Sequence, residues 1–345
     1  MKKLLLLAPF SVFLAACSNE FDVTTNWKEI PVAYAFLSPQ DTAHYIRVEK
    51  AFLDPEKSAL EIAQIPDSLY YPESDIAVYL QRVSTNQLFQ LYRVDGTQEG
   101  FPRKGGIFAT QPNYLYKIRN TEMDSLRRGE PYRLVIKRAD GQPDVTAQTT
   151  IPRDFAFQRP NPSMIPPTVF FDPGENVRVE WRGDTNSTYF NLMFNIRYRE
   201  ESGDGSVLGR DTLTWVVATN LKRGSSIVNT SFGPFYRTEH LVPSDNFFRF
   251  LADNIQPTTD KFRYFEFMSI TLLGGGKEIE DLLLVASANA GLTGAEILPA
   301  YTNLSEGFGL FTARNSTTLQ NVLIDIRTVD KMNQSPLTQG LNFRY

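Results

Sequence analysis

Apolar and polar residues alternate along much of the chain with the period of two that is typical of β-strands. In the first half this pattern predicts short strands over 31–37, 44–52, 76–81, 87–94, 132–137 and 145–151. Asp140-Gly141 is typical of a hairpin turn between the last two of these strands. A capping box at Ser58 predicts one helical turn over 58–64. Short strands at regular spacing indicate that the first half is a β-sandwich.

The second half shows the same alternation, with helical segments between the strands. Val177, Val179 and Trp181 alternate with charged residues, which predicts that Trp181 lies in a core. The remaining predicted strands are 190–198, 212–219, 262–273 and 321–327, and the predicted helices are 245–254, capped by Ser244, and 277–289. We therefore expect a mostly β protein: an immunoglobulin- or fibronectin-like β-sandwich followed by a β-rich α+β domain on an antiparallel sheet.

Five prolines between Asp154 and Pro173 predict a stiff crossing between the two halves. The expected organisation is a signal peptide over 1–16, an acidic tether over 17–27, the β-sandwich over 28–152, a proline-rich linker over 153–175 and the α+β domain over 176–345.

Composition narrows the possible classes of function. The 345 residues are 42% hydrophobic and 21% charged, as in ordinary globular proteins, which excludes a disordered, collagen-like or coiled-coil chain. A net charge of -4 provides no overall basic field for nucleic acid. The chain has one cysteine, so an internal disulfide or a CxxC redox site is excluded.

The N-terminus carries the most specific signal. Lys2 and Lys3 precede an apolar segment, 4–14, that is too short to span a membrane and is typical of a secretory signal. The following Leu14-Ala15-Ala16-Cys17 resembles a bacterial lipobox, which implies cleavage before Cys17 and acylation of that cysteine, with palmitate among the acyl chains. Several acyl chains would anchor the protein permanently. The alternative is an ordinary secretory peptide that happens to contain a cysteine.

Two further resemblances concern export. The residues after the cysteine, Ser18, Asn19, Glu20, Phe21 and Asp22, resemble the acidic export signal of Bacteroidota lipoproteins, although Asn19 departs from it. That resemblance implies lipid anchoring in the outer membrane facing the cell exterior, with a periplasm-facing anchor as the alternative. Four tripeptides resemble O-glycosylation sites of that phylum, with acceptors at Thr42, Ser68, Ser125 and Thr212.

Candidates for catalysis are few. His44 and His240 stand apart from each other, and neither the HExxH nor the GxSxG pattern occurs. The glycines 274–276 resemble a phosphate loop only superficially, because the acidic residues that follow them would repel phosphate. The carboxylate pairs Asp172 with Glu175 and Glu201 with Asp204 are weak candidates for acid–base chemistry. We therefore expect no catalytic residue, metal or cofactor.

Loop aromatics are the best candidates for a ligand platform, and they are Tyr70, Tyr71, Phe235 and Tyr236. The alternative is that these rings fill the core of a large β-protein, where Phe and Tyr are common.

Three motifs, 41–48, 51–53 and 303–311, resemble an uncharacterised group of Bacteroidota outer-membrane lipoproteins with a domain of unknown function. The run 126–136 resembles the late strands of a fibronectin-type or immunoglobulin-like domain. Gly307 and Gly309 in the last motif predict a bulge or a close backbone approach. The family resemblance implies an outer-membrane β-barrel partner, such as a TonB-dependent receptor.

The expected function is that of a non-enzymatic, surface-anchored binding or accessory subunit, for which we expect an exposed apolar patch larger than about 400 Å². One alternative is a carboxylate-based surface glycan hydrolase, which requires two carboxylates about 5 to 10 Å apart. The other is a structural component of envelope assembly or secretion.

Overall fold

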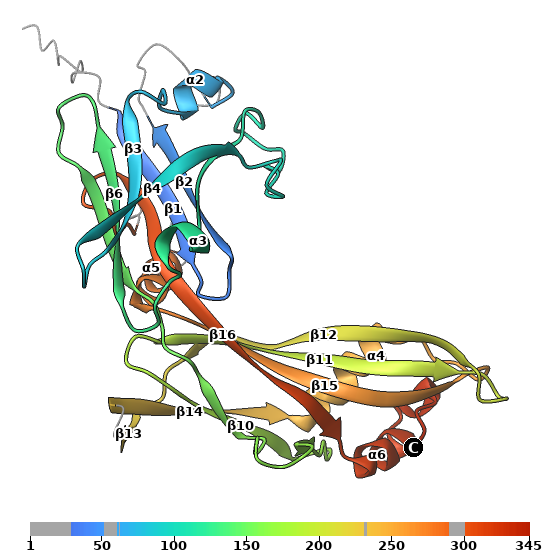
Figure 1. The fold of residues 1–345 in the computed structure, drawn as a ribbon. Coiled ribbons are helices and arrows are strands. Elements are labelled where there is room, and N and C mark those ends of the chain that lie inside the picture. Colours follow the sequence, from blue (N-terminus) through green and yellow to red (C-terminus); the bar gives the residue numbers. More distant parts are fainter. Residues whose placement is uncertain (1–28, 52–60, 62, 231–232, 290–300) are drawn as a thin grey trace, which may run out of the picture.

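The computed structural model describes residues 29–51, 61, 63–230, 233–289 and 301–345, and it is mostly β (Figure 1). The elements of the N-terminal unit are β1 (Ile30–Leu37), β2 (Ala43–Ala51), α2 (Pro66–Leu69), β3 (Ile76–Arg82), β4 (Gln87–Asp95), β5 (Tyr114–Arg119), α3 (Asn120–Met123), β6 (Pro131–Arg138) and β7 (Val145–Thr150). The first half of β4 pairs with β3 and its second half pairs with β5, so this strand belongs to both layers. One apolar core lies between the layers, which confirms the predicted β-sandwich.

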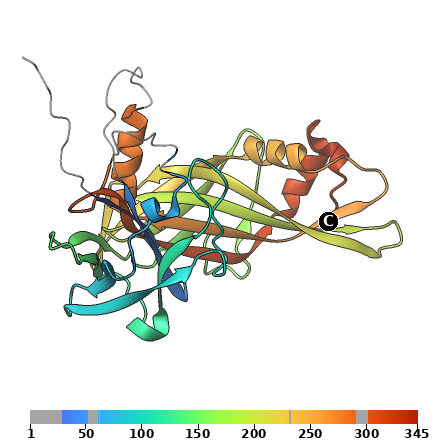
Figure 2. The ribbon, with the colours of Figure 1, turned by 90° about the horizontal axis from the view of Figure 1, so that it is seen from above.

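The second unit combines strands from two sheets with three of the helices. Its elements are β8 (Ala156–Arg159), β9 (Thr168–Val169), β10 (Asn176–Gly183), β11 (Tyr189–Glu201), β12 (Val207–Lys222), β13 (Ser226–Thr230), β14 (Gly233–Pro243), α4 (Ser244–Asn254), β15 (Phe262–Gly275), α5 (Lys277–Asn289), β16 (Phe308–Ile324), α6 (Ile326–Gln334) and the 3-10 turn η1 (Gln339–Leu341). The four-stranded sheet β13-β14-β10-β8 shares a core with β11, β15, α4 and α6. Helices α4 and α6 lie at the end of this unit that is remote from the sandwich (Figure 2). The predicted β-rich α+β class is confirmed.

One long strand joins the two units. Residues 308–313 of β16 pair in parallel with β1, and residues 314–322 pair with β15 (Figure 1). The larger sheet therefore runs through both units in the order β12-β11-β15-β16-β1-β2-β5-β4-β3-β6-β7. Leu304, Phe311 and Ala313 belong to the sandwich core, although the sequence-based division placed them in the second domain.

The junction of β1 with β16 explains which face of β1 is buried. Ala33 pairs with Gly309, whose φ is +134°, and a Cβ at Gly309 would lie 1.8 Å from the Ala33 carbonyl oxygen. A Cβ at Gly307 would lie 2.0 Å from the carbonyl oxygen of Pro31. The close backbone approach predicted at both glycines is confirmed. The small side chains of Ala33 and Ala35 fit the core face, which leaves the larger residues of β1 on the outside.

The predicted linker is instead part of the second unit. It contains β8 and β9, and it contributes Phe155, Phe157 and Phe171 to the core. The ring of Phe171 stacks on Phe247 with the centroids 3.9 Å apart. Prolines lie just outside the two short strands, while the aromatic residues near them supply apolar surface. The prolines in this segment therefore lie at the ends of strands, and they do not indicate a linker between two domains.

Two helix boundaries also differ from the sequence-based expectation. Ser244 is buried inside α4 and makes no side-chain cap, because Pro243 occupies the N-cap position. The last predicted strand ends at Ile324, and α6 follows, capped by Asp325, which accepts a hydrogen bond from the Arg327 N–H. The signal peptide, the tether and most of the predicted helical turn at 58–64 lie outside the described residues.

Candidate functional site

The outer face of β1 carries large aromatic side chains. Tyr34 and Phe36 alternate with buried residues, and each is 48% exposed. Tyr34 stands opposite Arg47 of β2, and Tyr45 precedes Arg47 by two residues on the same face. Phe101, from the loop between β4 and β5, is 50% exposed. Apolar rings are thus presented to solvent by three segments that are separate in sequence.

These residues line two adjoining hollows that we call the aromatic groove. The larger hollow has a volume of about 340 Å³ and includes Tyr34, Tyr45 and Phe101. The smaller one, about 200 Å³, lies against β11 and the end of β15 and includes Tyr189. Phe36 and Arg314 line both hollows, so the groove extends from the sandwich to the second unit.

Arg314 is placed at the point where β16 leaves β1 and joins β15. It pairs with Gly275 of β15, directly after Ala313, the last residue of β16 that pairs with β1. Its side chain is exposed, and within the described part of the chain its guanidinium makes no hydrogen bond or ion pair. Of the described residues that line the larger hollow, Asp41 is the one with a carboxylate. The groove therefore combines an aromatic surface with the positive charge of Arg314, which forms no ion pair with a described residue.

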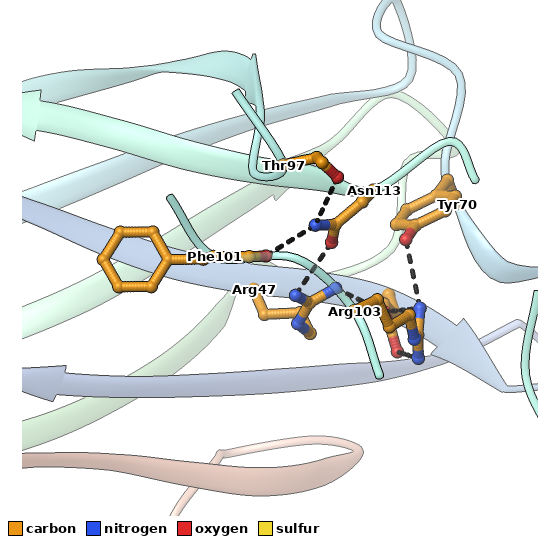
Figure 3. A network of polar contacts seen from close by, with 7 residues as sticks. Arg47, Tyr70, Thr97, Phe101, Arg103 and Asn113 are labelled. Atoms are coloured by element: carbon orange, nitrogen blue, oxygen red, sulfur yellow. Dashed lines mark hydrogen bonds and ion pairs between the residues drawn. The ribbon is translucent and has the colours of Figure 1, made fainter. Parts of the chain in front are cut away.

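A polar network fixes the loop that carries Phe101 (Figure 3). Arg47 Nη2 donates to Asn113 Oδ1 at 2.9 Å, and Asn113 Nδ2 donates to the Phe101 carbonyl oxygen at 2.8 Å. Asn113 is fully buried, so both ends of its amide are used within the protein. In Figure 3 the Phe101 ring points away from this network. The backbone at Phe101 is thus held in place while its ring remains available.

The same network continues toward α2. Arg103 donates to Glu49 Oε1 at 2.8 Å and to the hydroxyl oxygen of Tyr70 at 3.1 Å (Figure 3). Arg47 shares that Glu49 oxygen at 3.2 Å. Because two arginines converge on one carboxylate, both guanidinium groups are oriented without another ligand.

Tyr45 forms one wall of the groove. Its ring centroid is 4.7 Å from that of Phe101, at an interplanar angle of 56°. Its hydroxyl donates to Glu99 at 2.8 Å, and Lys117 Nζ lies 5.5 Å from the ring centroid. Burial and the hydrogen bond to Glu99 both raise the pKa of the Tyr45 hydroxyl, so the phenol stays neutral at physiological pH.

His44 is buried and lines the larger hollow. Its Nε2 lies 2.8 Å from Asn120 Oδ1. Burial lowers the pKa of the imidazole, which keeps it neutral. No group of three or more metal-ligating side chains occurs among the residues that the structure describes.

The structure does not bring together the four aromatic residues that were predicted to form a ligand platform. Tyr70 and Tyr71 are only 5% and 4% exposed in the sandwich, where α2 packs over β2. Phe235 and Tyr236 are half-buried on β14 in the second unit, and Arg223 lies 3.7 Å from the Tyr236 ring centroid. The two pairs therefore do not form one surface.

Other sequence candidates have structural roles. A Cβ at Gly274 would lie 2.5 Å from the Phe155 ring, so this glycine allows close packing. Asp172 pairs with Lys331 at 2.9 Å. Glu201 pairs with Arg199, and Asp204 accepts a hydrogen bond from the Ser206 N–H in a turn.

Among the candidate modification sites, Thr42 lies between Asp41 and Ala43, which line the larger hollow, and Ser68, Ser125 and Thr212 lie in other segments. Thr42, Ser125 and Thr212 are exposed and Ser68 is half-buried, so the hydroxyl groups of the first three residues are accessible at the protein surface. Cys17 and the export signal 18–22 lie outside the described residues. Whether these sites are modified stays a prediction.

Sequence reasoning did not identify the groove, although one signal was present. The alternation over 31–37 placed Val32, Tyr34 and Phe36 together on one face of β1. The three alternate residues Ala33, Ala35 and Leu37 are the fully buried ones. A strand whose smaller residues form the core face must present its larger residues outward.

Comparisons with known proteins add little to this picture. No family model and no curated protein matches the chain. Among solved structures, the chicken CNTN1 FN1–FN3 domains are similar at 10% identity, over 72% of this chain and 60% of that structure, with a TM-score of 0.21. This likeness is too weak to support an argument. None of the helices in the described regions is both long and apolar enough to cross a membrane.

Proposed function

We propose that this protein is a non-enzymatic lipoprotein, anchored through Cys17 to the outer membrane and facing the cell exterior, that serves as a binding or accessory subunit of a β-barrel complex of the TonB-dependent receptor type. The aromatic groove is the surface through which it contacts its partner. The resemblance of the N-terminus to a lipobox supports the anchor, and the family resemblance supports the kind of partner.

The observation that carries the proposal is the exposure of Tyr34, Phe36 and Phe101 beside Arg314. Large aromatic residues and arginine contribute most to binding energy at protein interfaces. The polar network around Asn113 fixes the Phe101 loop in advance, which reduces the entropy that must be lost on binding.

The tether places this surface close to the membrane. Residues 17–28 separate the predicted acylated cysteine from the first described residue, Glu29, which leads into β1. An extended chain of that length spans at most roughly 40 Å. The sandwich, and with it the groove, therefore lies within reach of a protein embedded in the same membrane.

The test is a pull-down in mild detergent from native outer membranes, read by mass spectrometry. Phe36→Ser is expected to lose a β-barrel protein that the wild type recovers stoichiometrically. Phe267→Ser is the matched control, because Phe267 is 46% exposed on β15 of the second unit and lies outside the groove. Equal recovery with Phe36→Ser would show that the groove is not the contact surface.

The anchor has its own test. Cys17→Ser is expected to move the protein from the membrane fraction to the soluble fraction, and retention without acyl chains would contradict the lipoprotein assignment. In the pull-down, recovery of assembly or secretion factors would instead favour a structural role. A protein recovered alone would make glycan arrays and hydrolase assays the next experiments.

A further inference from the structure

Among the strands that the structure describes, β12 is the outermost of the larger sheet and pairs on one side only. It is 16 residues long and forms its ladder with β11 (Figure 1). At the opposite end of the strand order, β7 is covered near its start, where the Ser305 N–H donates to the Thr146 carbonyl oxygen at 2.7 Å. Every second residue of an outer strand directs its backbone N–H and C=O away from the sheet, so β12 presents a row of unpaired groups.

The middle of β12 lacks the features that normally protect such an edge. Residues 212–216 contain no charge, proline or glycine, and they pair with β11 without a register shift, whereas shifts occur beyond Val216 toward the end of the strand. Thr212, Thr214 and Val216 are exposed along it. Charged residues occur only toward the two ends of the strand. Proteins usually protect exposed edges with lysine, proline or bulges, so this unprotected stretch is suited to pairing with another strand.

A row of polar side chains also ends at this edge. Asn195 Nδ2 of β11 lies 3.4 Å from the Ser269 hydroxyl of β15, and the Thr214 hydroxyl of β12 donates to Asn195 Oδ1 at 2.9 Å. The Thr214 oxygen keeps lone pairs that can accept a hydrogen bond. A further strand with a hydroxyl at the facing position would extend the row.

We infer that the occupant of this edge is β12 of a second copy of the chain, paired antiparallel about a two-fold axis at Thr214. In this register Thr214 faces its own copy, Leu213 faces Trp215, and Thr212 faces Val216. No like charges stand opposite each other, and Arg210 is already balanced by Glu266 at 2.8 Å. A two-fold axis at Arg210 or Asp211 would instead place two like charges opposite each other, so charge favours a register centred on the uncharged stretch.

The inference is independent of the proposed function, and its test uses the full chain carrying Cys17→Ser. That substitution removes the one cysteine of the chain, so an introduced cysteine is the only thiol. Sedimentation equilibrium at increasing concentration is expected to show a monomer–dimer equilibrium. Thr214→Lys is expected to raise the dimer dissociation constant about tenfold or more, because two lysines would face each other.

Thr271→Lys is the matched control, because Thr271 lies on β15 between two paired strands and should leave the dissociation constant unchanged. A mixture of Thr214→Lys with Thr214→Glu is expected to restore a heterodimer, which a folding defect would not do. Under mild oxidation Thr214→Cys should form a disulfide-linked dimer and Thr271→Cys should not.

Three results would overturn the inference. They are a monomer at all concentrations, a dimer that Thr214→Lys leaves intact, and the absence of a cross-link at Thr214→Cys in a sample that sediments as a dimer.

Discussion

The parallel contact between β1 and β16 can be tested by one added methyl group. In Gly309→Ala the new Cβ would lie 1.8 Å from the Ala33 carbonyl oxygen, 1.6 Å short of the 3.4 Å at which ordinary contact begins. Neither group can rotate away, because both belong to paired backbone. The strands must therefore separate where six residue pairs now join the C-terminal segment to the sandwich.

The expected cost has two parts. A φ of +134° is accessible to glycine and strained for alanine, which costs about 1 to 3 kcal/mol. Separation of the strands weakens several hydrogen bonds, worth about 1 kcal/mol each, and disturbs the fully buried Phe311. We expect Gly309→Ala to lower the free energy of unfolding by about 4 kcal/mol or more.

Two other glycines separate these contributions. Gly141 has a φ of +75° and nothing within 4 Å of its would-be Cβ, so Gly141→Ala should cost about 1 kcal/mol, from backbone strain alone. Gly209 has neither a positive φ nor a close neighbour, and Gly209→Ala should change stability by less than about 0.5 kcal/mol.

Urea unfolding followed by far-UV circular dichroism measures all three variants. Tryptophan fluorescence recorded in parallel on a Trp27→Phe background reports on the second unit, where the two remaining tryptophans, Trp181 and Trp215, lie. If Gly309→Ala is as stable as Gly209→Ala, the close approach of β16 to β1 leaves no room-limited contact at Gly309 and the predicted loss of stability is wrong.

Two further predictions concern buried groups of the second unit and its junction with the sandwich. Trp181→Ala should cost about 3 to 5 kcal/mol in the free energy of unfolding, because the side chain is fully buried against Phe190. Trp181→Phe should cost less, since the indole N–H has no hydrogen-bond partner among the described residues. A loss below about 1 kcal/mol for the alanine variant would place Trp181 outside the core. Burial raises the pKa of Glu278 above its ordinary value of 4.5, against the opposing effect of the hydrogen bond from Thr312. A carboxyl with a raised pKa stabilises the fold at low pH and loses that contribution as pH rises through its folded-state pKa, so Glu278→Gln should raise the melting temperature at neutral pH and lose this advantage in acid. Melting temperatures recorded across pH for this variant and for the control Glu280→Gln on the same helix would contradict the argument if the gain did not depend on pH.

The sequence by itself determined the local structure of this protein. Alternation with a period of two predicted strands such as 76–81 and 190–198, because a pleated strand places successive side chains on opposite faces. The same pattern placed Trp181 in a core, and the paired glycines 307 and 309 predicted a close backbone approach. These features depend on near neighbours in the chain, so the sequence carries them directly.

The tertiary structure decided which faces are buried and which distant segments meet. Alternation treats the two faces of β1 alike, and only the approach of β16, almost 280 residues later, selected Ala33 and Ala35 for the core and left Tyr34 and Phe36 outside. The groove brings these rings together with Phe101 and Arg314, and no local pattern connects those positions. Pairing between distant strands is set by the packing of the whole sheet, and this is why the residues of the candidate site are assembled by the fold and cannot be read from any one segment.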